Sequence, residues 1–138
     1  MTEPQVKQLK ANSSPLEVFE RMVAALNRHD LDGMVACFSR DYQSEQPFHP
    51  ERNFIGQAGV RKNWGFFFTS VPNIQMDILS ETIDGDTVWS ETLMYGTRVD
   101  GTQHSVRGVT IQRIRDNSII WARLYIEAPS DAKEGGLI

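Results

Sequence analysis

The fold is decided by HSVRGVTIQRIRDNSIIWARLYIE, residues 104–127, in which two alternating segments flank a short turn. Residues 104–115 and 119–127 are rich in β-branched and aromatic side chains, a composition typical of strands. Asp116-Asn117-Ser118 between them has the character of a hairpin turn. The stretch therefore predicts two antiparallel strands near the end of the chain.

The segments upstream extend this pattern. Residues 74–83 and 87–98 also alternate, and turn sequences rich in Asp and Gly follow each of them, at residues 84–86 and 100–102. A further strand is predicted at residues 41–48. The second half of the chain is thus expected to form an antiparallel meander.

The first half has helical periodicity instead. Ser14-Pro15-Leu16-Glu17 predicts a capping box, with proline at the first helical position. Asp30 is placed to cap a second, shorter helix. A third helix is expected from Gly56 to the segment Val71-Pro72-Asn73, because proline disfavours helical backbone before it. Three helices that cover one face of a sheet make an α+β domain.

Composition limits the class of protein. The 138 residues suffice for one domain, which we expect at residues 14–129, with a disordered leader at 1–13 and a flexible tail at 130–138. The formal net charge of −4 disfavours partners such as nucleic acid or anionic membranes. A single cysteine, Cys37, excludes an intrachain disulfide. Because no apolar stretch resembles a signal peptide or a membrane span, a cytoplasmic location is expected.

The alternation within each strand predicts which side chains face the helices. On residues 119–127, Ile120, Ala122, Leu124 and Ile126 form an apolar face. On residues 87–98 the bulkier set is expected inside, and it consists of Trp89, Glu91, Leu93 and Tyr95. The opposite face of the sheet carries a mixed apolar and basic surface, which predicts a homodimer interface. Its apolar members are Val109, Ile111, Trp121 and Tyr125.

The order of elements resembles the nuclear-transport-factor-2-like superfamily, and within it the SnoaL-like group. The resemblance covers residues 14–129 and rests on NRHDLD (residues 27–32), GQAGVR (56–61), RGVTI (107–111) and the terminal strand. It implies three N-terminal helices on a strongly curved, mostly antiparallel sheet, a cone-shaped α+β barrel that encloses a pocket, usually in a homodimer. This fold carries several chemistries, so it does not fix a reaction.

The known active sites of the superfamily are not repeated here. Ketosteroid-isomerase-like members use an Asp base and a Tyr–Asp oxyanion hole, and the matching positions hold Gln46, Met22 and Thr110. SnoaL-type cyclases use an Asp on the last strand, where this chain has Leu124. The Asp-Arg-Asp set of limonene-epoxide-hydrolase-like members matches Leu93, Glu91 and Leu124.

Two residues are the candidates for catalysis. Glu91, among bulky neighbours, would be desolvated, which raises a carboxyl pKa toward the range of a general acid or base. His49 lies in a proline-flanked loop expected at the pocket mouth, and imidazole titrates in the useful range. A structural ion pair for Glu91 and a surface position for His49 are the alternatives. The candidate ligand-binding residues are Gln46, Glu45, Trp64, Trp89, Tyr95, Thr110 and Leu124, and which of Glu45 and Gln46 faces inward depends on the strand register.

Two functions remain open from the sequence. The chain is either a cofactor-free acid/base enzyme of isomerase, cyclase or hydrolase type that acts on an apolar oxygenated molecule, or a non-catalytic ligand-binding or interaction domain. Three histidines without paired spacing, and one cysteine, favour no metal site. No glycine-rich phosphate loop follows a strand, so no nucleotide cofactor is expected.

Overall fold

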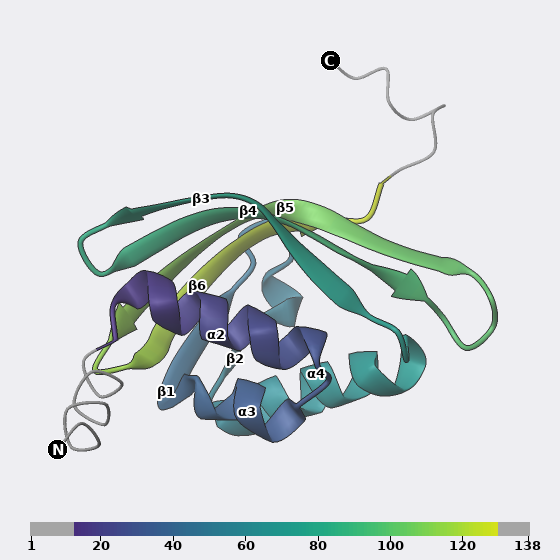
Figure 1. The fold of residues 1–138 in the computed structure, drawn as a ribbon, viewed down its shortest axis with the longest axis horizontal. Helices are drawn as coiled ribbons and strands as arrows, with labels where there is room; N and C mark the ends of the chain where they lie inside the picture. Colours follow the sequence, from purple (N-terminus) through teal and green to yellow (C-terminus); the bar gives the residue numbers. More distant parts are fainter. Residues whose placement is uncertain (1–12, 130–138) are drawn as a thin grey trace, which may run out of the picture.

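The computed structural model describes residues 13–129, which form three α-helices, a short 3-10 helix and six strands (Figure 1). The expected leader, apart from Ser13, and the expected tail lie outside the described residues. The elements in chain order are α2 (Pro15–Asn27), α3 (Leu31–Ala36), β1 (Phe38–Glu45), η1 (Pro50–Arg52), β2 (Phe54–Ile55), α4 (Gln57–Ser70), β3 (Gln75–Asp84), β4 (Thr87–Thr97), β5 (Gln103–Arg115) and β6 (Ser118–Glu127).

The strands form one sheet in the order β2-β1-β6-β5-β4-β3. Neighbouring strands are antiparallel except β1 and β6, which run parallel. The sheet arches over the three helices, all of which lie on its concave side (Figure 1). These observations confirm the predicted α+β class with a curved, mostly antiparallel sheet. The sheet stays open between β2 and β3, so the cone is not a closed barrel.

The helix ends follow the local sequence. The Ser14 hydroxyl accepts a hydrogen bond from the Glu17 amide at 3.2 Å, and the Ser14 amide donates to the Glu17 carboxylate at 2.8 Å, so the predicted capping box is formed. The Asp30 carboxylate caps α3 by accepting from the Gly33 amide at 2.9 Å. Gly56 precedes α4 with a φ of 96°, a conformation that glycine adopts without steric cost.

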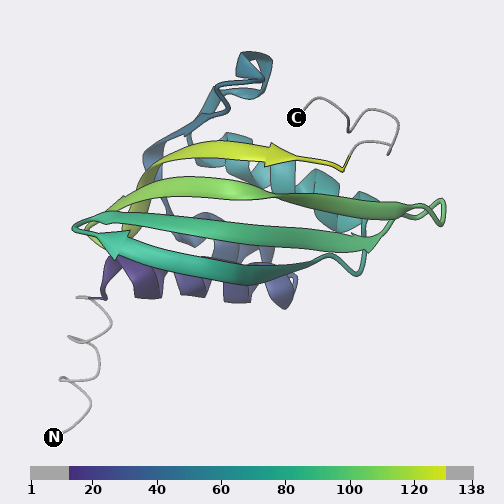
Figure 2. The ribbon, with the colours of Figure 1, turned by 90° about the horizontal axis from the view of Figure 1, so that it is seen from above.

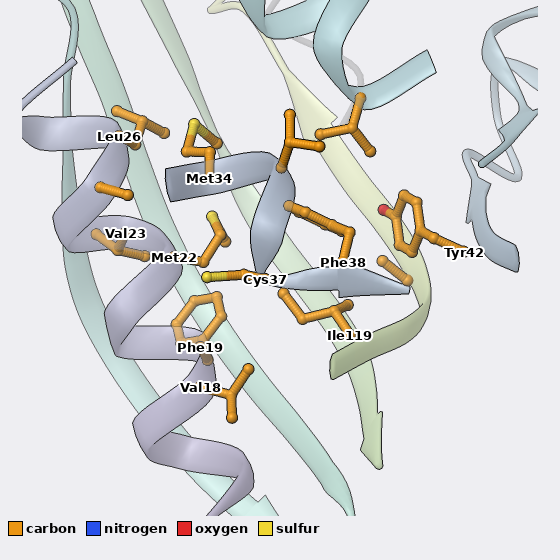
Figure 3. Packing of buried hydrophobic residues seen from close by; sticks show 14 of the residues in the cluster. Val18, Phe19, Met22, Val23, Leu26, Met34, Cys37, Phe38, Tyr42 and Ile119 are labelled. Atoms are coloured by element: carbon orange, nitrogen blue, oxygen red, sulfur yellow. The ribbon is translucent and has the colours of Figure 1, made fainter. Parts of the chain in front are cut away.

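The core lies between α2, α3 and the sheet (Figure 3). Its largest fully buried side chains include Phe19, Leu26, Met34 and Ile119. The thiol of Cys37 is buried among them, and this burial raises its pKa above the ordinary value. Such a thiol is a poor nucleophile at neutral pH.

Strand boundaries at two places differ from expectation. Strand β1 begins at Phe38, three residues earlier than predicted, because α3 ends at Ala36. On β6, Ile119 rather than Ile120 is fully buried. A register shift between Arg113 and Ile114 of β5 changes the alternation there, which a strict period of two does not anticipate.

The expected orientation of β4 is wrong. Val88, Ser90, Thr92 and Met94 are buried on the concave side, whereas Trp89 and Tyr95 are 45% and 38% exposed. Space explains the choice, since side chains converge on the inner face of a curved sheet. A Cβ atom added at Gly96, on the same face, would lie 2.5 Å from a methyl carbon of Val71, nearer than side-chain carbons approach one another.

Candidate functional site

A cavity of about 540 Å³ lies between α4 and the concave face of the sheet. One wall is formed by α4 through Trp64 and Phe67, and the opposite wall by β1 through Phe38 and Tyr42. The floor consists of side chains from β4, β5 and β6, namely Thr92, Met94, Val106, Thr110, Leu124 and Ile126. The interior is therefore mostly apolar, with hydroxyl groups set into it.

The hydroxyl groups of the cavity differ in how they are bonded. Thr110 shares a hydrogen bond of 2.8 Å with Ser90, and the Tyr42 phenol is bonded to Ser44. Burial raises the pKa of Tyr42 to about 12, so the phenol stays protonated near neutrality. Thr92 is 5% exposed and lines the floor of the cavity, so its hydroxyl faces the space that a bound molecule would occupy.

The mouth of the cavity is more polar. Gln46 and Arg52 line it from the segment between β1 and β2, Asn63 from α4, and Glu127 from the end of β6. Figure 2 shows the segment with η1 and β2 extending past the edge of the sheet beside β6. Polar groups from three separate parts of the chain therefore meet at this opening.

His49 contacts the mouth through Glu127. Its Nε2 atom is hydrogen-bonded to the Glu127 carboxylate, and its Nδ1 atom lies 3.6 Å from the Glu51 carboxylate. The His49 side chain is 29% exposed, so the pair lies at the rim rather than inside the cavity. The structure thus places a predicted catalytic residue beside a carboxylate that lines the site.

The remaining predicted ligand-binding residues divide into two groups. Four line the cavity: Gln46, Trp64, Thr110 and Leu124. Trp89 and Tyr95 lie on the convex face, because the orientation of β4 is opposite to the expected one. Of the two neighbours at the end of β1, Gln46 lines the cavity, whereas the Glu45 carboxylate accepts a hydrogen bond from Arg123 at 3.2 Å.

Glu91 lies outside the cavity, so its expected inward position is wrong. Its carboxylate accepts two hydrogen bonds from Arg107, at 3.2 and 3.0 Å, across the convex face. Both partners are more than a third exposed. The arrangement is the surface ion pair that the sequence left as the alternative, and the desolvation argument for Glu91 as an acid or base does not apply.

A buried histidine supports one wall of the cavity. His104 is 6% exposed, its ring lies 5.5 Å from that of Phe67, and its Nε2 atom has no partner among the described residues. Burial, and secondarily the charge of Arg98, lowers the pKa of His104 below its ordinary value. The ring is therefore neutral near neutrality, and it stands behind Phe67 rather than on the cavity surface.

Sequence reasoning missed three residues of the mouth, which are Arg52, Asn63 and Glu127. Arg52 and Asn63 are exposed, and because charged and polar residues are common at exposed positions, neither stands out in the sequence. Glu127 falls in the outward set of its strand, and the loop after β1 brings His49 to it from 78 residues away in the sequence. No local pattern signals a contact of that sequence separation.

Residues 13–129 hold no group of three or more His, Cys, Asp or Glu side chains arranged to bind a metal ion. Among the helices described, none has the length and apolar character needed to cross a membrane.

Comparison with solved structures shows the same fold at low identity. The chain is similar to IdmH, a proposed polyketide cyclase from Streptomyces antibioticus, with a TM-score of 0.72, 17% identity and coverage of 83% of this chain and 93% of that one. It is also similar to a ketosteroid-isomerase-like protein from Catenulispora acidiphila in complex with trimethylamine, with a TM-score of 0.69, 18% identity and coverage of 82% and 86%.

A third similar structure is AclR, a proposed hydroxylase from Streptomyces galilaeus, with a TM-score of 0.71, 21% identity and coverage of 82% and 88%. Among curated protein sequences, none matches this chain. The model of one family does match, over residues 19–122, which run from α2 into β6 and include most of the cavity lining. On this match, the chain belongs to the SnoaL-like domain family.

Proposed function

We propose that the protein binds an apolar, oxygenated small molecule in the cavity and converts it by acid/base chemistry without a cofactor. The observation that carries the proposal is the cavity itself. Its 540 Å³ lies within the range of small-molecule sites, and its walls are mainly aromatic and aliphatic. The Thr92 hydroxyl gives such a molecule one fixed hydrogen-bonding point on the floor.

The proton-transfer group of this proposal is the pair formed by Glu127 and His49. Interior hydroxyl groups are too weakly acidic to ionise near neutrality, and burial raises the pKa of Tyr42 in particular to about 12. A carboxylate hydrogen-bonded to an imidazole is a common arrangement for general acid/base catalysis. Glu127, which lines the cavity, is assigned the contact with substrate, and His49 is assigned the positioning of Glu127.

The similar proteins support a small-molecule role. One carries a proposed polyketide cyclase assignment and another was crystallised with trimethylamine. The alternative, a binding domain without catalysis, is favoured by one observation, the exposure of the Glu127 side chain, which is 62% accessible to water. An experiment must therefore separate binding from turnover.

The proposal also includes a homodimer formed through the convex face of the sheet. Val109, Tyr125 and Trp89 are all more than a third exposed, and a partner that covered them would remove apolar surface from water. Arg107 and Arg123 are each paired with a carboxylate on the same side of the sheet, so a partner copy would meet paired rather than isolated charges.

A suitable test of catalysis uses 5-nitrobenzisoxazole, an apolar probe whose ring opens when a base removes one proton. We expect the protein to accelerate this opening above the buffer rate, and E127Q to abolish the acceleration. H49Q should reduce it, because Glu127 would lose its positioning partner. D41N, which removes an exposed carboxylate of β1 outside the cavity lining, serves as the matched control.

The outcomes separate the two functions. Acceleration that depends on Glu127 supports the enzyme. Saturable binding of the probe with no acceleration supports the non-catalytic domain, and equal acceleration by wild type and E127Q excludes the assigned base. A protein that binds no apolar probe at all contradicts both functions.

A further inference from the structure

The charge at the cavity mouth is asymmetric. Arg52 lines the opening, and its guanidinium donates one hydrogen bond, of 3.2 Å, to the amide oxygen of Gln46. Within residues 13–129, no carboxylate lies within ion-pair distance of Arg52. The acidic residue of the lining, Glu127, is bonded to His49 and not to Arg52. The guanidinium at the mouth is therefore bonded to a neutral side chain and not to a carboxylate.

Arg52 differs in this respect from half of the ten arginines in residues 13–129. Five of them pair with a carboxylate at 2.7–3.2 Å: Arg28, Arg61, Arg107, Arg115 and Arg123. Arg52 has acidic residues near it in sequence, since Glu51 precedes it, yet Glu51 faces His49 instead. An arginine at the edge of an apolar cavity without an anionic partner leaves donors available to a ligand.

The segment that carries Arg52 is held in place by its own hydrogen bonds. The Arg52 amide donates to the His49 carbonyl at 2.9 Å, and the Asn53 amide donates to the Pro50 carbonyl at 3.1 Å. The Asn53 side chain accepts from the Gln46 amide at 2.7 Å, which joins the two ends of the segment. The backbone that carries Arg52 is thus held in place without a ligand, which reduces the entropy lost by this segment on binding.

We propose that the ligand of this cavity is an apolar acid, whose ring system contacts Trp64 and Phe67 while a planar oxyanion binds Arg52 at the mouth. A carboxylate, or the ionised oxygen of an enol or phenol beside a carbonyl, matches the fork of donors that a guanidinium presents. The inference rests on the proposed binding function of the cavity and adds the substrate class and the residue that selects it.

The test compares two probes that differ in charge but hardly in shape, anthracene-2-carboxylate and anthracene-2-carboxamide, each titrated by fluorescence. We expect wild type to bind the carboxylate more tightly than the carboxamide. R52Q should weaken carboxylate binding by about tenfold or more, the usual effect of losing a hydrogen bond to a charged group, and leave carboxamide binding within about twofold. R52K should retain part of the preference, because it keeps the charge but not the planar fork.

Two further variants locate the effect. R40Q removes an exposed arginine of β1 that is not part of the cavity lining, and it should leave both affinities unchanged. N63W places a bulky ring at the mouth from an exposed position of α4, so it should weaken both probes and show that they occupy the cavity.

The failures are distinguishable. If neither probe binds wild type, or if N63W has no effect on either, the proposed binding function of the cavity is wrong. If both probes bind and N63W weakens both, but R52Q leaves the carboxylate unaffected or weakens the two probes equally, the cavity function stands and the assignment of Arg52 is overturned.

Discussion

The two faces of the sheet use side chains of different size. The concave face carries small or hydroxyl-bearing residues in its centre, such as Ser90, Thr92 and Thr110, all buried. The convex face carries the larger Trp89 and Tyr95, both more than a third exposed. On a curved sheet, therefore, available space rather than hydrophobicity decides which alternate set lies inside, and the small set leaves room for the cavity.

On the convex face, arginine side chains pack against an aromatic ring. The guanidinium carbons of Arg113 and Arg123 each lie 4.9 Å from the ring centre of Trp121, and Arg123 also donates to Glu45. Arginine over an aromatic ring covers apolar surface while it keeps its charge hydrated. The inner face thus leaves space for the cavity, whereas the outer face carries arginines stacked on an aromatic ring.

The largest difference between the buried side and the exposed side of the sheet should appear in the free energy of unfolding. Leu26→Ala removes a fully buried side chain that packs under the concave face, and should lower the free energy of unfolding by about 2–5 kcal/mol. Leu79→Ala makes the same change at a position that is 42% exposed, and should cost less than about 1 kcal/mol. Urea denaturation measures both, and equal costs would contradict the division between interior and surface.

A charge on the convex face should break the proposed dimer. Val109→Glu places a carboxylate in the apolar patch, and we expect the dissociation constant to rise by about 30-fold or more, the effect of losing a central contact of an interface. Light scattering over a concentration series measures it. Asp41→Asn is the control, and a wild-type protein that is monomeric at about 100 μM would rule out the interface.

The free energy of unfolding should depend on pH through a carboxyl group on the edge strand β3. The pKa of Glu81 on β3 is raised from 4.5 to about 7, first by desolvation and then by a hydrogen bond to Glu20 and its charge. The folded state therefore holds a proton that the unfolded chain loses near pH 4.5, and this contribution to stability disappears as pH rises to about 7.

The consequence is testable by substitution. Glu81→Gln should flatten the decline in unfolding free energy between pH 5 and pH 8, and should stabilise the protein at the upper end of that interval. The same denaturation curves recorded for Asp41→Asn should keep the slope of wild type. An unchanged slope in Glu81→Gln would show that the two carboxyl groups do not share a proton.

The smallest effect is expected at the ion pair that the sequence singled out. Glu91→Gln removes one charge of the exposed pair with Arg107, so it should cost no more than about 1 kcal/mol. Binding of either anthracene probe should be unchanged, because Glu91 is not part of the cavity lining. Loss of probe binding in this variant would mean that the two faces communicate.

The parts of the fold set by local chemistry could be predicted. Ser14 and Glu17 specify the start of α2, and the apolar spacing of α4 specifies a helix that ends near Val71, because caps and periodicity act over a few residues. Thr110 of β5, which the sequence analysis names as a ligand-binding candidate, lines the cavity. Each of these predictions depended on neighbours in sequence or on a shared fold.

The site itself was less predictable for a physical reason. Which side chains of β4 face the helices depends on the space between the helices and the curved sheet. The sequence of one strand carries no information about that space. The contact between His49 and Glu127 joins residues 78 positions apart. The guanidinium of Arg52 matters because it is bonded to the Gln46 amide and not to a carboxylate, a fact that the local sequence does not reveal. Alternation correctly identified two faces of β4 and assigned the wrong one to the core.

The parallel pairing of β1 with β6 governs when the domain is able to fold during synthesis. Phe38 lies opposite Ile119, so β1, which follows the first two helices, pairs with the rest of the sheet only after the last strand has been made. Its other partner, β2, supplies two residues. On the ribosome, β1 consequently lacks its longer partner until β6 has emerged, and closing so long a loop makes folding slow and dependent on protection of the nascent chain.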